Sequence, residues 1–225
     1  MSELEKAMMQ VHRRMRWMTG VVGILATLAA FGAATARAAD VIDEWATIKA
    51  PSPPELKPVT LDPASTALIV MDISTQSCTT SRRPRCVATL PAIQKLLAEA
   101  RAKGVFILYT LAGTTKRTDI VKEVVPTDAE QALSGGAPDK FVGIDLESIL
   151  KSKNIKTLIT VGTAAEGAVL HTAAGAAFRG FDAVVPIDGM SSSNIYAEQY
   201  TAWHLANAPR LADRVKLTQV NLIKF

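Results

Sequence analysis

The chain has 225 residues, of which 48% are apolar and 20% charged, a composition typical of a globular protein and not of a disordered or collagen-like chain. Its length fits one domain or at most two small ones, and its two cysteines exclude a cysteine-rich scaffold and a cysteine-based zinc site. The net charge of +4 and the pI of about 9.1 indicate a nucleic-acid or membrane partner only if the basic residues lie in the folded part.

The N-terminal residues have the three parts of a secretory signal peptide. Three arginines between positions 13 and 16 precede an uncharged apolar run over 18–34, and the small-x-small cleavage sequence 36–38 follows. We therefore predict a signal peptide over 1–38, cleaved after Ala38, and a periplasmic or secreted mature protein. The alternative is an uncleaved membrane anchor, because the run reaches the short end of the roughly 17–25 residues that span a bilayer.

Much of the basic excess lies in this leader. Of the 25 basic and 21 acidic residues, five basic and two acidic ones fall within 1–38, so the mature chain is close to neutral. We therefore expect no nucleic-acid partner, and membrane contact only through an uncleaved leader.

After the leader, a proline-rich lead-in over 39–65 is expected to lie extended along the surface. From residue 66 onward, short apolar runs alternate with segments whose apolar residues recur at helical spacing, and only 112–140 has no periodicity. This alternation predicts one α/β domain over 66–225, a three-layer fold in which helices cover both faces of a mostly parallel sheet. The expected strands are 66–72, 105–111, 156–162, 181–188 and 214–223, and the expected helices are 87–104, 145–153, 165–180 and 197–208.

In open α/β sheets, ligands bind beyond the carboxyl ends of the strands. Three parts of this chain are expected there. They are Asp72 with the loop that follows it, the irregular segment 112–140, and the turn 162–168. Functional residues are therefore expected in these three parts.

Cys78 and Cys86 stand on either side of a turn-like segment. Because export brings the chain into an oxidising compartment, we predict a disulfide between them. The alternative is a pair of free thiols, of which Cys78 would then be a candidate nucleophile. Three arginines of the same loop either clamp an anionic substrate or form a solvated basic loop; they are Arg82, Arg83 and Arg85.

Two segments, ALIVMD and GTAAEGAVLHTA, carry a family resemblance. The second resembles the nucleophile motif Gly-x-x-Thr-x-x-Cys-Val-x-x-Thr-Ala of the isochorismatase-like cysteine hydrolase superfamily, which it matches at Gly162, Val169, Thr172 and Ala173. The strand before it, the helix after it and the continuation FRGFDAVVPIDGMS follow the family's order. The resemblance covers roughly 64–208 and implies the isochorismatase-like hydrolase fold.

The resemblance also implies a catalytic set of Asp, Lys and Cys, in which the Asp takes the proton of the thiol. Asp72 matches the Asp, but Ala168 occupies the position of the nucleophilic Cys, and Ala165 that of the motif's Thr. Without a thiolate there is no covalent thioester route. Lys140 matches the family's Lys if the loop before Phe141 is shortened; the alternative is a surface lysine.

The start of the following helix is expected to keep free backbone N–H groups, which bind carboxylate or carbonyl oxygen without a thiol. The expected oxyanion or ligand-binding residues are Ala164, Ala165, Glu166 and Gly167. Family members carry a cis peptide in this turn, which the resemblance places at Ala164–Ala165. Glu166 is either a first-turn carboxylate that suits the helix dipole or a replacement base.

We expect no metal ion or other cofactor, because the mature chain has only two histidines, far apart in sequence, and no cluster with metal-ligand spacing. The small residues at 173–177 let their helix pack closely against the sheet or against a partner, which is consistent with a homo-oligomer. The serines at 191–193 are expected to cap the next helix.

Two functions fit these residues. The first is an exported hydrolase of a small amide or related carbonyl compound, in which Asp72 activates a water in place of the missing thiolate and Lys140 assists. The second is a catalytically inactive member of the family that binds a small anionic ligand or a protein partner, which Ala168 favours.

Overall fold

The computed structural model describes residues 38–225. These residues belong to two compact units, which divide between Ala50 and Pro51. The predicted signal peptide lies outside the described residues except for its last position, so its cleavage stays a prediction. Within 38–225, no helix combines the length and the apolar character that a membrane span requires.

The lead-in 39–65 is not extended throughout, in contrast to the sequence prediction. In the first unit, helix α2 (Val41–Glu44) begins at the N-cap Asp40, whose carboxylate accepts two backbone N–H groups. In the second unit, strand β1 (Val59–Thr60) pairs in parallel with β9 (Ile223–Lys224) and buries its first side chain. The proline-rich segment is therefore attached to the end of the chain by backbone hydrogen bonds.

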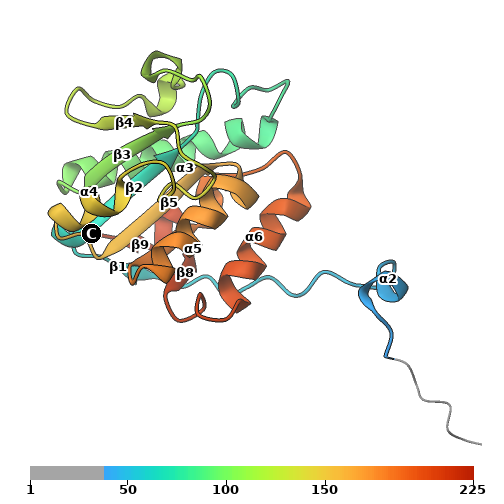
Figure 1. The fold of residues 1–225 in the computed structure, drawn as a ribbon. Coiled ribbons are helices and arrows are strands. Elements are labelled where there is room, and N and C mark those ends of the chain that lie inside the picture. The colour runs from blue at the N-terminus through green and yellow to red at the C-terminus, as the bar shows by residue number, and fades with distance from the viewer. Residues whose placement is uncertain (1–37) are drawn as a thin grey trace, which may run out of the picture. The chain divides into compact units, whose positions relative to one another are not determined.

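A parallel sheet forms the centre of the second unit (Figure 1). Its strands follow the order β4-β3-β2-β5-β6-β8, and the short β7 pairs with the end of β5. All these pairings are parallel, as the alternation of strands and helices predicts. The strands are β2 (Thr66–Met71), β3 (Phe106–Leu111), β4 (Gln131–Ser134), β5 (Thr157–Thr163), β6 (Asp182–Pro186), β7 (Met190–Ser191) and β8 (Val215–Thr218).

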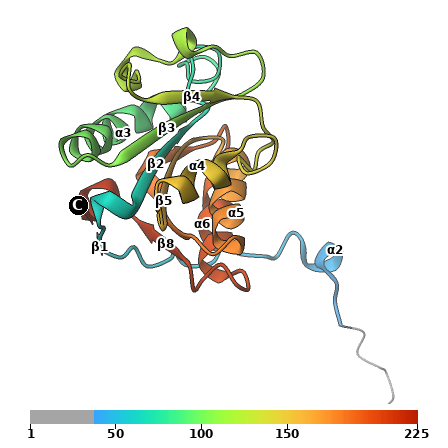
Figure 2. The same ribbon diagram turned by 60° about the vertical axis from the view of Figure 1, so that its left-hand side comes forward.

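Alternate side chains of β2 enter two separate apolar cores, one on each face of the sheet. Those of Ala67, Ile69 and Met71 share a core with α4, α5 and α6, whereas those of Leu68 and Val70 pack in the core under α3. Figure 2 shows α3 on one side of the sheet and α4 and α5 on the other. The three-layer prediction is therefore confirmed. The helices are α3 (Pro84–Ala102), α4 (Leu146–Ser152), α5 (Leu170–Phe178) and α6 (Ile195–Asn207).

Helix α3 begins three positions before the predicted residue 87, inside the segment that the sequence assigned to a turn. Its first residue is Pro84, whose fixed φ suits the first helical position and whose missing N–H would have no partner there. At the other end, Gly104 adopts a φ of +70°, which ends the helix as predicted.

Two predicted segments differ in detail. The irregular segment 112–140 contains the edge strand β4, whose residues are half-buried or exposed and therefore have no buried apolar pattern. The predicted strand 214–223 breaks after β8, because the backbone N–H of Val220 turns to donate to the carboxylate of Asp188 at 3.0 Å. The chain then enters β9.

Candidate active site

Asp72 lies at the carboxyl end of β2, where a ligand site is expected. Its φ of +58° falls in the left-handed region, which is uncommon for a residue with a Cβ atom and is enriched at functional sites. Its backbone N–H donates to the carbonyl oxygen of Thr110 at 3.0 Å, and its Oδ1 accepts from Oγ1 of Thr110 at 2.8 Å. The neighbouring strand β3 therefore fixes both the main chain and the carboxylate of Asp72.

Lys140 reaches the same carboxylate from the segment between β4 and α4. Its Nζ lies 2.8 Å from Oδ2 of Asp72, and its side chain is only 3% exposed. The alternative of a surface lysine is therefore wrong. Each carboxylate oxygen of Asp72 has one protein donor, Thr110 or Lys140, and keeps a lone pair for a further donor such as water.

Ala168 lies in a π-helical turn, Ala165–Val169, that joins β5 to α5. The register of β2 with β5 pairs Met71 with Gly162, so Asp72 and this turn follow neighbouring strands at the same edge of the sheet. Ala168 is 4% exposed, and its methyl group stands where the resemblance places a thiol. The third position of the implied catalytic set is thus at the same edge of the sheet but has no nucleophile.

The backbone approaches β2 closely as it enters this turn. Gly162 has a φ of +128°, and a Cβ atom on it would lie 2.1 Å from the carbonyl oxygen of Met71. The cis peptide bond lies at Thr163–Ala164, one position before the Ala164–Ala165 bond that the resemblance implied. A side chain at position 162 would therefore push the two strands apart.

The turn keeps part of the predicted set of amide donors. The backbone N–H groups of Ala165 and Glu166 have no hydrogen-bond partner among residues 38–225. Those of Gly167 and Val169 both donate to the carbonyl oxygen of Ala164, at 3.1 and 3.2 Å. The predicted donor at Gly167 is therefore already occupied, whereas the N–H groups of Ala164, Ala165 and Glu166 have no partner in the described part of the chain.

Glu166 joins the turn to the loop that precedes α6. Its Oε1 accepts from Oγ of Ser192 at 2.9 Å, and its Oε2 is buried without a hydrogen-bond partner in the described part of the chain. Its place in the first turn also suits the helix dipole. The contact with Ser192 gives this carboxylate a structural role in holding the turn.

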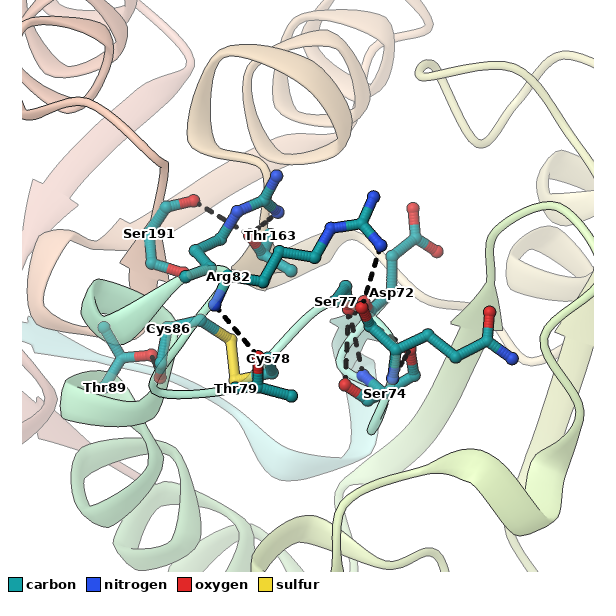
Figure 3. Close-up of a disulfide and its surroundings, with 12 residues drawn as sticks. Asp72, Ser74, Ser77, Cys78, Thr79, Arg82, Cys86, Thr89, Thr163 and Ser191 are labelled. Atoms are coloured by element: carbon teal, nitrogen blue, oxygen red, sulfur yellow. Dashed lines mark hydrogen bonds between the residues drawn. A yellow bond between two sulfur atoms is a disulfide. The ribbon is translucent and has the colours of Figure 1, made fainter.

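Cys78 and Cys86 form a disulfide, so this prediction is confirmed (Figure 3). The bond joins the loop after Asp72 to the first turn of α3. Because the sulfur of Cys78 is bonded to that of Cys86, the hypothesis that Cys78 is the nucleophile is wrong.

Two arginines of the disulfide loop bind other parts of the protein. Arg83 donates from Nη1 to Oγ1 of Thr163 at 2.5 Å and from Nε to Oγ of Ser193 at 3.2 Å. Arg85 forms a two-bond ion pair with Glu198 in α6. These side chains hold the disulfide loop against the turn and against α6, and each guanidinium donates from two nitrogens to acceptors of the protein.

Arg82 has a different environment. It is exposed, and its Nη1 donates to the carbonyl oxygen of Gln76 at 3.1 Å. Figure 3 shows its guanidinium on the side of the loop that carries Asp72. The remaining N–H groups of this guanidinium have no partner among residues 38–225, so Arg82 is the arginine of the three that best fits an anion-binding role.

The sequence motifs do not identify Thr110, although its hydroxyl is the closest neutral donor to the carboxylate of Asp72. Its position was a usable signal, since it stands next to the end of the strand that neighbours β2, and parallel strand ends meet at one edge. The serines at 191–193 lie in the loop before α6, as predicted, but the capping side chain is that of Asn194, which accepts the backbone N–H of Tyr196.

The remaining candidates contribute nothing to this site. The small residues of α5 pack mostly into the chain's own core, and Gly175 contacts Asp139. Within 38–225, no three His, Cys, Asp or Glu side chains lie close enough together to hold a metal ion. The groups available for chemistry are thus a carboxylate that accepts protons, an ammonium beside it, and the free amide donors of the turn that carries Ala168.

Comparison with known proteins supports the resemblance. The family model described as the Isochorismatase domain matches residues 66–215. N-carbamoylsarcosine amidase of an Arthrobacter species is 27% identical, over 50% of this chain and 56% of that protein. A secreted isochorismatase effector of Verticillium dahliae is 29% identical, over 48% of this chain and 62% of that protein. The chain thus spans less than two thirds of the length of these two relatives.

The matches to solved structures with the same fold cover a larger share of both chains. An isochorismatase family protein from Desulfovibrio vulgaris superimposes with a TM-score of 0.64 at 19% identity, over 70% of this chain and 95% of that one. The nicotinamidase of Staphylococcus aureus gives a TM-score of 0.61 at 21% identity, over 69% of this chain and 99% of that one. At these identities, the likeness establishes the fold.

Proposed function

The chain belongs to the isochorismatase family, and on that premise we propose that it is an exported hydrolase that cleaves a small amide or related carbonyl compound without a cysteine nucleophile. The observation that carries the proposal is the buried Asp72–Lys140 pair. Burying two charges costs several kcal/mol per ion, and a buried pair is weak support for stability. Its presence beside the turn of Ala168 therefore favours a role in chemistry.

The proposed reaction uses Asp72 as the general base. Its carboxylate takes a proton from a water molecule, the water oxygen forms a bond to the substrate carbonyl carbon, and the C–N bond breaks as the leaving amine takes up the proton. The backbone N–H groups of Ala165 and Glu166 donate to the carbonyl oxygen as it gains negative charge. Lys140 offsets the buried charge of Asp72 and holds it in place.

Arg82 is the proposed contact for an acidic part of the substrate. Its planar guanidinium suits two-bond recognition of a carboxylate, and its free donors lie on the loop that follows Asp72. Arg83 and Arg85 support this loop rather than bind the substrate, because each already donates from two nitrogens to acceptors of the protein. A small amide that also carries a carboxylate is therefore the preferred substrate.

Release of ammonia from N-carbamoylsarcosine, nicotinamide and other small amides tests this function, with the first two chosen from the relatives' names. We expect Asp72→Asn to lower kcat by about 10²- to 10⁴-fold, the usual contribution of a general base. Asp62→Asn is the matched control, because Asp62 caps a short helix at the surface and Asn caps equally well. Turnover that survives Asp72→Asn would exclude Asp72 as the base.

Ala168 favours a second function, that of a catalytically inactive relative which binds a small anion or a protein partner. Such a protein would release no ammonia from any amide yet would still bind a small carboxylate. Calorimetric titration with acetate and with N-carbamoylsarcosine, in the wild type and in Arg82→Met, separates this case from turnover.

Export is part of the proposal. The Cys78–Cys86 disulfide favours an oxidising compartment, and the secreted Verticillium dahliae relative is consistent with it. We propose cleavage after Ala38 and a periplasmic or secreted product. Intact-mass analysis of the exported protein tests this, and an N-terminus upstream of Ala39 would contradict it.

A further inference from the structure

The segment that carries Lys140 is attached to α5 on both sides. The backbone N–H of Lys140 donates to Oγ1 of Thr172 at 3.1 Å, and that hydroxyl donates in turn to the carbonyl oxygen of Pro138 at 3.3 Å. Thr172 is fully buried in α5, and Lys140 is 2% exposed. The main chain at Lys140 is thus held by the helix that follows the Ala168 turn.

The residue before Lys140 occupies the space beside a glycine of α5. A Cβ atom on Gly175 would lie 2.6 Å from Oδ1 and 2.8 Å from Oδ2 of Asp139, closer than such atoms approach one another. Oδ1 of Asp139 also accepts the backbone N–H of Phe141 at 2.9 Å, which folds the chain tightly around Lys140. The absence of a side chain at Gly175 therefore lets this segment approach the helix.

Arg179, the C-cap residue of α5, contacts the residues on both sides of Lys140. Its Nη1 donates to the carbonyl oxygen of Gly175 at 2.9 Å and lies 3.4 Å from Oδ2 of Asp139. Its guanidinium carbon lies 4.6 Å from the ring centre of Phe141, at the distance of a cation–π contact. One half-buried guanidinium thus holds both neighbours of the buried lysine.

We propose that Arg179 and Gly175 are positioning residues, which hold Lys140 against the carboxylate of Asp72. Helix α5 then links two parts of the site, because it follows directly on the turn that carries Ala168, and its last turn and C-cap hold the segment of Lys140. This inference rests on the role proposed for the Asp72–Lys140 pair. Because its test measures no turnover, a failure of this inference can be distinguished from a failure of the proposed function.

The test measures the coupling between Asp72 and Lys140. A double-mutant cycle of Asp72→Asn and Lys140→Met, read from urea unfolding of the full chain, is made in the wild type, in Arg179→Met and in Arg214→Met. Arg214 is the matched control, since its Nη1 donates to the carbonyl oxygen of Gly180 and to Oδ1 of Asp182. A purely structural role of Arg179 would lower the stability of all members alike and leave the coupling unchanged.

We expect the coupling to fall by at least about half in Arg179→Met and to stay unchanged in Arg214→Met. An equal coupling in all three backgrounds would overturn the proposal, as would the absence of coupling in the wild type. The variants that combine three substitutions are the least stable. A second measurement therefore uses single variants and follows the acetylation of their lysines by acetic anhydride.

In the wild type, Lys140 should react more slowly than the exposed Lys95, since its amine is buried and paired. Arg179→Met and Gly175→Ala should raise the rate at Lys140 at least about fivefold through local opening, and Arg214→Met should not. Arg179→Lys keeps the charge but loses the planar guanidinium. Its acetylation rate at Lys140 should lie between the rates in Arg179→Met and Arg214→Met. Equal protection of Lys140 in Arg179→Met and Arg214→Met would also overturn the proposal.

Discussion

The ammonium of Lys140 lies 2.8 Å from Oδ2 of Asp72, and the two side chains are 3% and 12% exposed. Removing one partner leaves an uncompensated charge away from water. We therefore expect Lys140→Met to lower the free energy of unfolding by about 3–5 kcal/mol.

The double variant with Asp72→Asn should recover part of this loss, because neither charge is then left alone. Urea unfolding at neutral pH measures both effects. Lys95→Met is the control, since the Lys95–Glu99 pair is exposed and such pairs contribute only about 0.3–0.5 kcal/mol. A loss at Lys140 no larger than that at Lys95 would contradict the buried pair.

The disulfide between Cys78 and Cys86 closes a short loop, with a sequence separation of 8. Restriction of the unfolded chain by so short a loop is worth roughly 2–3 kcal/mol, so Cys78→Ser with Cys86→Ser should lower the free energy of unfolding by that amount. Reductant should destabilise the wild type to a similar extent and leave the double variant unchanged. Thiol titration of the denatured protein without reductant should find no free thiol, and two free thiols would contradict the bond.

Glu130 links stability to pH. Burial alone would raise the pKa of its carboxyl, but hydrogen bonds from Arg101 and from the backbone N–H of Thr127 outweigh burial and hold the pKa below its ordinary value of 4.5. A carboxylate with a lowered pKa in the folded state adds stability above the unfolded value, and this is lost as the pH falls through the folded value.

The stability of the wild type should therefore exceed that of Glu130→Gln by about 1.5–3 kcal/mol at pH 7, the range for hydrogen bonds to charged groups. The difference should persist down to about pH 5 and close below pH 4.5. Urea unfolding between pH 7 and pH 3 measures it. Glu55→Gln, at an exposed position, should differ little from the wild type at any pH. A difference that is as large at pH 3 as at pH 7 would be evidence against the assigned contacts.

The layers of the fold and the place of Asp72 could be predicted because both are local in the sequence. The strand 66–71 is a continuous apolar run since both of its faces are covered, and Asp72 is the residue that ends it. The edge strand β4 could not be predicted, because its half-exposed residues form no continuous apolar run.

The place of Lys140 was left open by the sequence for a different reason. Its segment has no periodicity, and its position depends on Thr172, Gly175 and Arg179, which are distant in the chain. The partners of Arg83 and Glu166 depend likewise on distant loops. Local patterns carry no information on such contacts until the layers are assembled.

Gly162 is expected to be the glycine least tolerant of a side chain. A Cβ atom there would lie 2.1 Å from the carbonyl oxygen of Met71, and both atoms belong to paired backbones that cannot rotate away. Gly162→Ala should therefore lower the free energy of unfolding by more than about 4 kcal/mol or prevent folding.

Gly104→Ala is the matched control, because Gly104 has a positive φ of +70° but no heavy atom within 4 Å of a Cβ. Gly104→Ala should lower the free energy of unfolding by only about 1–2 kcal/mol, which is the strain of the left-handed conformation. Circular dichroism and urea unfolding compare the two variants. Similar losses in both would show that conformation, and not the close approach of β2 and β5, decides the effect.

Ala168→Cys tests whether the site lacks only its nucleophile. Position 168 is buried in the turn that follows β5, at the same edge of the sheet as Asp72 and Lys140. A thiol there would have a carboxylate to take its proton and the Ala165 and Glu166 amides to stabilise an oxyanion. We expect ammonia release from small amides to rise at least about a hundredfold over the wild type and to be abolished by iodoacetamide.

Ala168→Ser is the matched control for this change, because a hydroxyl of similar size stays protonated and should give little gain. The disulfide leaves no other thiol in the chain, so alkylation reports on position 168 alone. Lys140→Met should remove most of the gain by disturbing Asp72. A folded Ala168→Cys variant that hydrolyses no small amide would mean that the arrangement around Asp72 is no longer suited to hydrolysis, and the binding function would then be preferred.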